Sequence, residues 1–107
     1  AVKIKLADML MIVEASRLLI HKAAFNAQNG LPDILESSTA KCFSNEMSRE
    51  VTTTAMQLMG GYGYNKEYGM ERRVRDAFGW GIAGGTIDIQ KINIASAMIG
   101  RRFNQRN

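Results

Sequence analysis

Apolar residues recur at spacings of three and four through most of this chain, and its only proline, Pro32, lies between two of the periodic stretches. This period is typical of an α-helix with one side against a core. Because proline interrupts helix interiors, a chain with so little of it can form long helices. The pattern therefore predicts an all-α fold, an antiparallel four-helix bundle with short connections.

The first predicted helix runs from Val2 to about Asn29, where Asn29–Gly30 provides the left-handed stop that is common at helix ends. Two neighbouring stripes of residues follow its length, and together they predict burial over a wide arc. One stripe contains Leu6, Leu10, Val13, Arg17, Ile20, Ala24 and Ala27. The other contains Met9, Ile12, Ser16, Leu19 and Ala23.

A second helix is expected after a short loop over residues 31–36. It should begin near Ser37 or Ser38, because either hydroxyl can cap its first turn. Its apolar period continues to Met59, and the pair Gly60–Gly61 ends it. Residues 61–69 are dense in Gly and Tyr and are expected to form a loop. A two-stranded hairpin is the alternative there, although no alternation of apolar and polar residues supports it.

Two more helices are expected in the last third of the chain. A short charged helix from Met70 to about Phe78 is followed by a second glycine-rich loop over residues 82–85. Thr86 is a suitable N-cap for the last helix, and Asp88 places a negative charge in its first turn, where the helix dipole favours it. This helix should run to about Arg102, with residues 104–107 frayed.

The charge balance and the scarcity of Cys and His argue against several classes of function. A net charge of +4 is spread along the chain, whereas a nucleic-acid site needs a basic stripe, so we expect no nucleic-acid partner. One cysteine, Cys42, and one histidine, His21, leave no intramolecular disulfide and no multi-cysteine metal site. We expect Cys42 to be buried or half-buried and His21 to lie on a helix surface or in a satisfied interior position. No apolar run is long enough to span a bilayer.

Each glycine-rich loop admits a structural interpretation and a binding one. Gly60–Gly63 can simply end a helix, but glycine also lets a ligand approach the backbone closely. The amide of Gln57, one turn earlier, can both donate and accept hydrogen bonds. Gly84–Thr86 precedes a helix, and the free N–H groups of a helix N-terminus make a candidate oxyanion or phosphate site.

The segment Glu71–Asp76 mixes acidic and basic residues. The first interpretation is a solvated helix face with internal ion pairs. The alternative is that Arg75 and Asp76 lock the two glycine-rich loops relative to each other.

Taken in order, these segments resemble the C-terminal helical domain of the acyl-CoA dehydrogenases. The resemblance rests on Leu6–Arg17, Gln57-x-x-Gly60-Gly61-x-Gly63-Tyr64, Glu71–Arg72, Arg75–Asp76–Ala77 and Gly85-Thr86-x-Asp88-Ile89-Gln90. It covers almost all of residues 1–107, while the family's N-terminal helical and middle β domains are absent from this sequence.

The resemblance implies FAD as the cofactor and an acyl-CoA thioester as the substrate. The residues that would contact the FAD of a neighbouring subunit are Gln57, Leu58, Met59, Gly60 and Gly61. The residues that would contact the FAD of the same subunit are Thr86, Ile87 and Asp88, the last of these shorter than the family's usual Glu or Gln. Gly84 and Gly85 would bind the substrate, with the Gly84 N–H bonded to the thioester carbonyl and polarising it.

The implied reaction is α,β-dehydrogenation, in which a carboxylate removes the α-proton and the flavin accepts the β-hydride. Gly84 stands where many members carry that catalytic glutamate. We therefore assign no catalytic residue to this chain, expect the glutamate upstream of Ala1, and expect the isolated chain to be inactive. The alternative is a non-catalytic helical assembly or binding module derived from this fold.

The resemblance also implies partners and a compartment. The partners are the acyl-CoA, an electron-transfer flavoprotein or similar acceptor, and further copies of the chain in a homo-oligomer, a dimer or tetramer. The compartment is the cytoplasm of a bacterium or the mitochondrial matrix of a eukaryote.

Overall fold

A computed structural model describes residues 1–28 and 30–101, and within these ranges the chain forms helices and no strand. The longer helices are α1 (Val2–Asn26), α2 (Ile34–Met59), α4 (Met70–Trp80) and α5 (Ile87–Ile99). A single turn, α3 (Gly61–Tyr64), and a 3₁₀ turn, η1 (Lys66–Tyr68), join α2 to α4. The expected all-α class is confirmed. None of the helices in the described ranges is long and apolar enough to cross a membrane.

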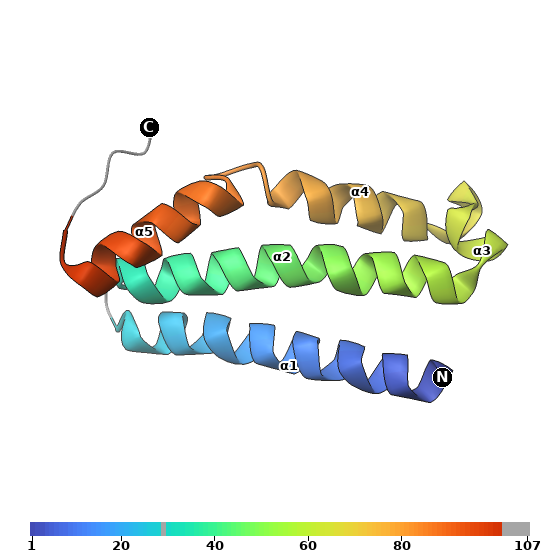
Figure 1. Cartoon of the computed structure of the whole chain (residues 1–107), viewed down its shortest axis with the longest axis horizontal. Helices are drawn as coiled ribbons and strands as arrows, with labels where there is room; N and C mark the ends of the chain where they lie inside the picture. The colour runs from blue at the N-terminus through green and yellow to red at the C-terminus, as the bar shows by residue number, and fades with distance from the viewer. Residues whose placement is uncertain (29, 102–107) are drawn as a thin grey trace.

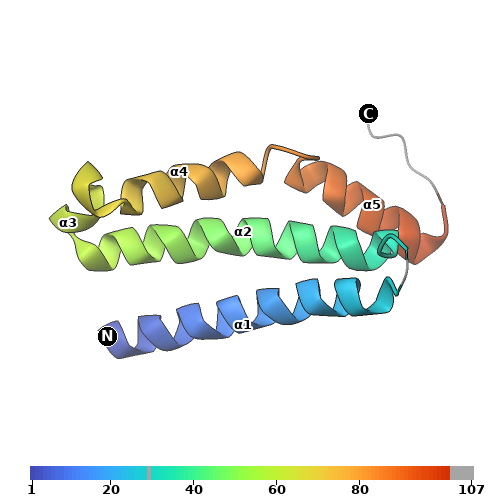
Figure 2. The same ribbon diagram turned by 180° about the vertical axis from the view of Figure 1, so that it is seen from behind.

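The helices form three layers with α2 in the middle (Figures 1 and 2). Helix α1 runs antiparallel to α2 on one side, and α4 and α5 follow one another along the other side. Among the described residues, α1 packs only on α2 and touches neither α4 nor α5. The radius of gyration is 16.1 Å, against about 13 Å for a compact domain of this length. The four expected helices therefore form an open, elongated stack.

The side chains buried between these layers are mostly small. Among the described residues, the buried apolar ones are Ala23, Ala40, Cys42, Met70 and Ala77, and the buried polar ones are Ser38 and Gln90. Small side chains let neighbouring helices approach closely, but they remove little apolar surface from water. No large side chain in the described part is fully buried. The expected burial of Cys42 is confirmed.

The two stripes predicted on α1 have different surroundings. The second stripe faces α2, with Ala23 buried and the rest half-buried. Apart from the half-buried Ala27, the first stripe is exposed, with Leu6 at 52%, Leu10 at 62% and Ile20 at 48% of their full exposure. The predicted wide arc of burial is therefore wrong for this chain, because α1 has one neighbouring helix and not two.

The connection between α1 and α2 differs from the expectation at both of its ends. Helix α1 ends at Asn26, and Gln28 takes a left-handed φ of 52°, while the predicted stop at Asn29 lies outside the described residues. Helix α2 begins at Ile34, ahead of the expected Ser37 or Ser38. The reason is a cap that the sequence analysis missed.

That cap is formed by Asp33, whose carboxylate accepts a hydrogen bond from the Glu36 backbone N–H at 3.3 Å. An aspartate before the first turn with a glutamate three residues later has the spacing of a capping box, and the aspartate half of that motif is formed here. The Glu36 carboxylate also accepts a hydrogen bond from the Asn26 side chain at 2.8 Å. The same glutamate therefore helps to start α2 and to hold the end of α1 beside it.

The ends of the last two helices also shift slightly. Helix α4 continues two residues beyond the predicted Phe78, to Trp80. Helix α5 ends at Ile99, where Gly100 takes a left-handed φ of 72°. The predicted end at Arg102 and the tail over 104–107 lie outside the described residues.

The first glycine-rich loop folds back over the end of α2 as the helical turn α3, so the hairpin alternative is excluded. Gly60 makes the reversal with a φ of 62°. Gly63 is buried against α2, and a Cβ on it would lie 2.6 Å from the Met56 carbonyl oxygen and 3.0 Å from the Met59 Cβ. Gly63 therefore permits a backbone contact that any other residue would obstruct.

We expect Gly63→Ala to lower the free energy of unfolding by about 1–3 kcal/mol, the usual effect of overpacking. Gly61→Ala is the matched control, because its added methyl group has nothing within 4 Å and should change the free energy by less than about 0.5 kcal/mol. Denaturant unfolding followed by circular dichroism measures both. Equal losses in the two variants would contradict the proposed close contact.

Candidate functional site

The second glycine-rich loop joins α4 to α5 over the middle of α2 (Figure 1). Cations on α2 bond to the backbone carbonyls where α4 ends. The Lys41 Nζ donates to the carbonyls of Trp80 at 3.2 Å and Ala83 at 3.0 Å. Arg49 Nη2 donates to the Phe78 carbonyl at 3.4 Å. The last carbonyls of a helix lack intrahelical donors and carry partial negative charge, so these two cations satisfy and stabilise the end of α4.

Arg49 also packs beneath the loop. Its guanidinium carbon lies 4.9 Å from the centre of the Phe78 ring, a cation–π distance. Gly81 is buried above the guanidinium, and a Cβ on Gly81 would collide with it. Glycine at this position therefore lets Arg49 pass under the loop. The Arg49 Nε is buried with no partner in the described part of the chain.

Gly84 and Gly85 give the loop a backbone that other residues rarely adopt, with φ values of 68° and 99°. A Cβ on Gly85 would lie 2.5 Å from the Nε2 of the buried Gln90. Gly84 has more room, since its nearest atom would be the Lys41 Cε at 3.8 Å. Gly84 is exposed, and its N–H donates to no acceptor within residues 1–28 and 30–101. The loop thus presents a free backbone donor to the surface.

The start of α5 confirms the predicted cap. The Thr86 hydroxyl accepts a hydrogen bond from the Ile89 N–H at 3.2 Å, and the Ile87 N–H reaches back to the Gly81 carbonyl at 3.2 Å. Thr86 and Ile87 are half-buried, and Asp88 is exposed in the first turn. The free Gly84 donor therefore lies close to the positive end of a helix of thirteen residues.

The first glycine-rich loop presents a second candidate region. Gln57, Gly60 and Gly61 are exposed, and a Cβ on either glycine would meet nothing within 4 Å. Leu58 is half-buried and Met59 is 37% exposed. A groove of about 320 Å³ lies beside Gln57. Its other lining residues are Lys5, Asp8, Met9, Ile12, Glu50, Val51, Thr53 and Thr54.

The two candidate regions do not meet. They lie at opposite ends of α4, a helix of eleven residues, or about 16 Å at the usual rise per residue. The two glycine-rich loops lie along one flank of the molecule and not at one end of it (Figure 1). The predicted site residues therefore form two separate groups.

The residues that hold the second loop were missed by the sequence analysis. Lys41 and Arg49 bond to carbonyls 29 to 42 positions later in the chain, so no local spacing marks them. Arg75 and Asp76, the alternative candidates, are exposed and line an open groove of about 450 Å³ beside Trp80. They lie on the solvated face that the first interpretation expected, but the internal ion pairs that it also expected do not form within residues 71–76.

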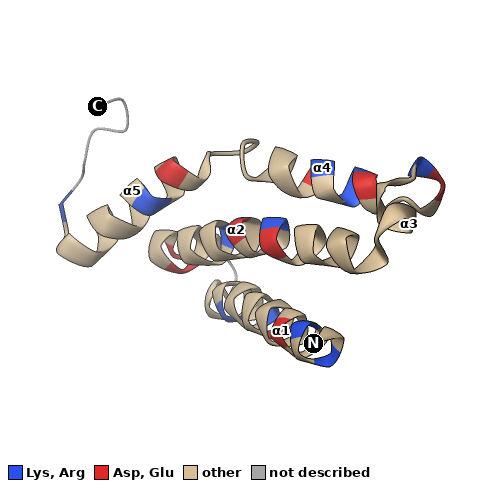
Figure 3. Ribbon diagram, turned by 45° about the vertical axis from the view of Figure 1, so that its right-hand side comes forward, with Lys and Arg blue, Asp and Glu red and all other residues tan. Residues whose placement is uncertain are grey.

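Charged side chains also join α2 to α5. Glu46 and Lys91 form an ion pair at 2.6 Å, and the hydrogen bond to Glu46 raises the pKa of Lys91. Burial raises the pKa of the nearby Cys42 thiol, and the Glu46 carboxylate adds to that effect. Figure 3 shows acidic and basic residues interspersed along the helices. In the part of the chain that the structure describes, no cluster of His, Cys, Asp or Glu could hold a metal ion.

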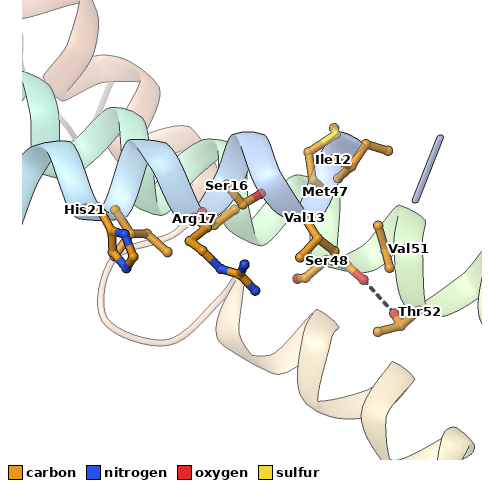
Figure 4. Close-up of a pocket in the computed structure, with 11 residues that line it drawn as sticks. Ile12, Val13, Ser16, Arg17, His21, Met47, Ser48, Val51 and Thr52 are labelled. Atoms are coloured by element: carbon orange, nitrogen blue, oxygen red, sulfur yellow. Dashed lines mark hydrogen bonds between the residues drawn. The ribbon is translucent and has the colours of Figure 1, made fainter. Parts of the chain in front are cut away.

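A groove of about 400 Å³ runs between α1 and α2 (Figure 4). It is mainly apolar, and the exposed His21 and Arg17 lie along it. The Ser44 hydroxyl on its α2 side is buried and has no partner within the described ranges. The expectation of a surface position for His21 is confirmed. Helices α1 and α2 thus leave an apolar seam that no third helix among the described residues covers.

Residues 1–99 match the family description "Acyl-CoA dehydrogenase, C-terminal domain". A relative from Mycobacterium tuberculosis, named as a probable acyl-CoA dehydrogenase FadE25, is 44% identical over 100 residues, which are 92% of this chain and 26% of the relative. The chain thus spans about a quarter of the length of its relatives.

Two solved structures are similar in fold and sequence. Butyryl-CoA dehydrogenase from Megasphaera elsdenii superposes with a TM-score of 0.86 at 40% identity, over 91% of this chain and 25% of that one. A chain in a structure of the electron transferring flavoprotein of Acidaminococcus fermentans gives a TM-score of 0.88 at 37% identity, over 92% of this chain and 26% of that one.

We expect Thr86→Ala to lower the free energy of unfolding by about 1 kcal/mol, because it removes the hydroxyl that caps α5. Thr86→Ser keeps the hydroxyl and should lose less than half of that amount. Thermal and denaturant unfolding measure the difference. If the serine variant is as unstable as the alanine variant, the methyl group and not the cap is responsible.

Proposed function

Because this chain belongs to the acyl-CoA dehydrogenase family, through the family's C-terminal domain, we propose that it is the FAD- and acyl-CoA-binding domain of a flavin-dependent acyl-CoA dehydrogenase. The reaction proposed is α,β-dehydrogenation of an acyl-CoA thioester. The observation that carries this proposal is the exposed, unbonded N–H of Gly84 on a loop held rigidly between α4 and α5.

The Gly84 N–H is suited to a thioester carbonyl. A fixed donor at that oxygen stabilises the negative charge that develops when the adjacent α-carbon loses a proton. The donor is preorganised, since the Ala83 carbonyl is bonded to Lys41 and the Thr86 cap fixes the end of the loop. Binding the carbonyl therefore requires no rearrangement of the loop.

Gly84 cannot itself take the α-proton, because it has no side chain. General base catalysis needs a group within hydrogen-bond reach of the proton it removes. We propose that a glutamate outside these 107 residues approaches the same α-carbon. The chain would then contribute the electrophilic half of the site and another segment the basic half.

The first loop is suited to a cofactor because its backbone is accessible at the surface. Gly60 and Gly61 offer close approach, and the exposed Gln57 amide can pair with a polar edge of FAD. Beyond the second loop, Thr86, Ile87 and Asp88 would adjoin the FAD of the same subunit. When bound, FAD supplies the acceptor for the β-hydride.

The separation of the two loops supports contacts with two different FAD molecules. Eleven residues of α4 lie between them, so each loop faces its own region of the surface. We propose that Gln57, Leu58, Met59, Gly60 and Gly61 contact the FAD of a neighbouring subunit. This arrangement makes each site incomplete without a second copy of the chain.

Exposed apolar surface supports the same homo-oligomer, a dimer or tetramer. The first stripe of α1 and the seam between α1 and α2 leave apolar side chains in contact with water. Apolar patches of this kind are typical of protein interfaces. For the electron acceptor we propose an electron-transfer flavoprotein or a similar protein.

The base proposal is tested in the full-length flavoprotein, by anaerobic mixing with acyl-CoA thioesters while the flavin absorbance is followed. Replacing the upstream glutamate by Gln should abolish flavin reduction and leave FAD bound. Adding Gly84→Glu to that inactive protein should restore part of the reduction. The added Cβ meets only the Lys41 Cε at 3.8 Å, although the left-handed backbone there disfavours an L-residue by about 1–2 kcal/mol.

Gly84→Gln in the same background is the matched control, since it has the same size and no carboxylate. Restoration by both residues would show that bulk, and not a base, is responsible. A full-length protein that binds FAD but is never reduced by any acyl-CoA would favour the non-catalytic assembly module.

We expect the 107-residue chain to form dimers or larger species in sedimentation velocity at micromolar concentrations. Leu10→Glu, on the exposed stripe, should weaken self-association by about 10- to 100-fold, because burying a leucine contributes about 1.5–3 kcal/mol. Lys3→Glu is the control on the same helix, outside the two stripes. A monomer at all concentrations would count against the interface.

A further inference from the structure

We propose that Lys41 is a positioning residue that aims and polarises the Gly84 N–H toward the substrate carbonyl. The proposal rests on the function proposed above and concerns the same site. Lys41 lies far from Gly84 in sequence, on the central helix α2, and is half-buried beneath the loop.

The first step is the geometry of one peptide unit. The Lys41 Nζ donates to the Ala83 carbonyl at 3.0 Å, and that carbonyl shares its peptide plane with the Gly84 N–H. The described chain contains no cis peptide bond. In a trans peptide the C=O and the N–H point in opposite directions. The bond from Lys41 therefore turns the Gly84 N–H away from α2.

The second step concerns the rotation of that plane. Gly84 and Gly85 both have positive φ, and glycine has more accessible backbone conformations than other residues. A peptide between Ala83 and two such residues is free to rotate unless something holds it. Lys41 holds it at the carbonyl, and its second bond, to Trp80 at 3.2 Å, fixes the ammonium itself.

The third step is electrostatic. A cation bonded to a carbonyl withdraws electron density from the peptide group and strengthens the N–H on its other side as a donor, because hydrogen bonds in a chain polarise one another. The charge of Lys41 thus reaches the thioester through one peptide unit. A neutral side chain of the same length would fill the space without providing this effect.

The experiment uses the full-length flavoprotein and Lys41→Met, which keeps the aliphatic stem and removes the ammonium. We expect kcat to fall about tenfold, less than the 10²- to 10³-fold lost when an oxyanion donor is removed outright. KM and FAD content should change less than about twofold, since the N–H remains present in the ground state. Lys41→Arg, which keeps a cation, should recover part of kcat.

A spectroscopic probe separates positioning from general stability. An enoyl-CoA with a para-dimethylaminophenyl group absorbs at longer wavelength when its thioester carbonyl is polarised. The wild-type protein should shift this band to the red, and Lys41→Met should lose most of the shift. Lys91→Met is the matched control, because it also removes a lysine that ties a helix to α2, here through Glu46, and should keep both the shift and kcat.

Each other result overturns the proposal. Unchanged kcat and band position in Lys41→Met would show that the ammonium does not act on Gly84, and so would a slow variant with a wild-type band. If Lys41→Met loses FAD, Lys41→Gln is measured instead, and loss of FAD there too would make the lysine purely structural. A wild-type protein that neither shifts the probe nor is reduced by acyl-CoA would overturn the proposed function itself.

Discussion

Two cations on α2, Lys41 and Arg49, donate hydrogen bonds to backbone carbonyls at and just beyond the end of α4, where intrahelical donors are lacking. The remaining geometry of the α4–α5 turn follows from these bonds. With the carbonyls of Phe78, Trp80 and Ala83 tied to α2, the chain passes from α4 to α5 along the same side of α2 within a few residues, and glycines supply the backbone angles (Figure 1). The cap of α5 at Thr86 then fixes the other end of the turn. A catalytic backbone donor needs this degree of order, because a donor that must reorganise during the reaction stabilises charge poorly.

The same central helix explains why the rest of the chain is open. All the longer helices in the described ranges pack on α2, and the buried side chains are mostly small, with three alanines, one cysteine and one serine beside Met70 and Gln90. Close approach of helices through small residues leaves the larger apolar side chains on the outer faces, where Leu10 and Leu18 are more than half exposed. A chain that spans about a quarter of its relatives' length has these faces available for other domains or subunits. The apolar seam between α1 and α2 belongs to this surface.

Much of this fold can be predicted from the sequence, since helical periodicity and glycine stops are local signals. The periodicity predicts α1, α2 and α5, and Thr86 is identified as a cap from its place before an apolar helix. Periodicity shows which residues share a helix face but not how many helices pack against that helix. The sequence therefore predicts burial of the first stripe of α1, which is exposed in the structure. The Asp33 cap cannot be singled out from the sequence, because Ser37 and Ser38 are equally plausible caps. The structure shows that Asp33 caps the helix and that both serines lie inside it.

The candidate site shows a similar division. Glycine motifs locate both loops, because a backbone with positive φ or a very close contact favours glycine over other residues. The cations that hold the second loop are not visible in this way, since Lys41 and the Ala83 carbonyl are 42 positions apart. The chemistry that we propose at Gly84 illustrates the consequence. A backbone N–H and a side-chain carboxylate are separable functions of one position, so replacing glutamate by glycine removes the base and leaves the donor in place. In the site that we propose, the donor depends on the lysine that holds the preceding peptide, so that Lys41 would set how strongly this loop polarises a carbonyl.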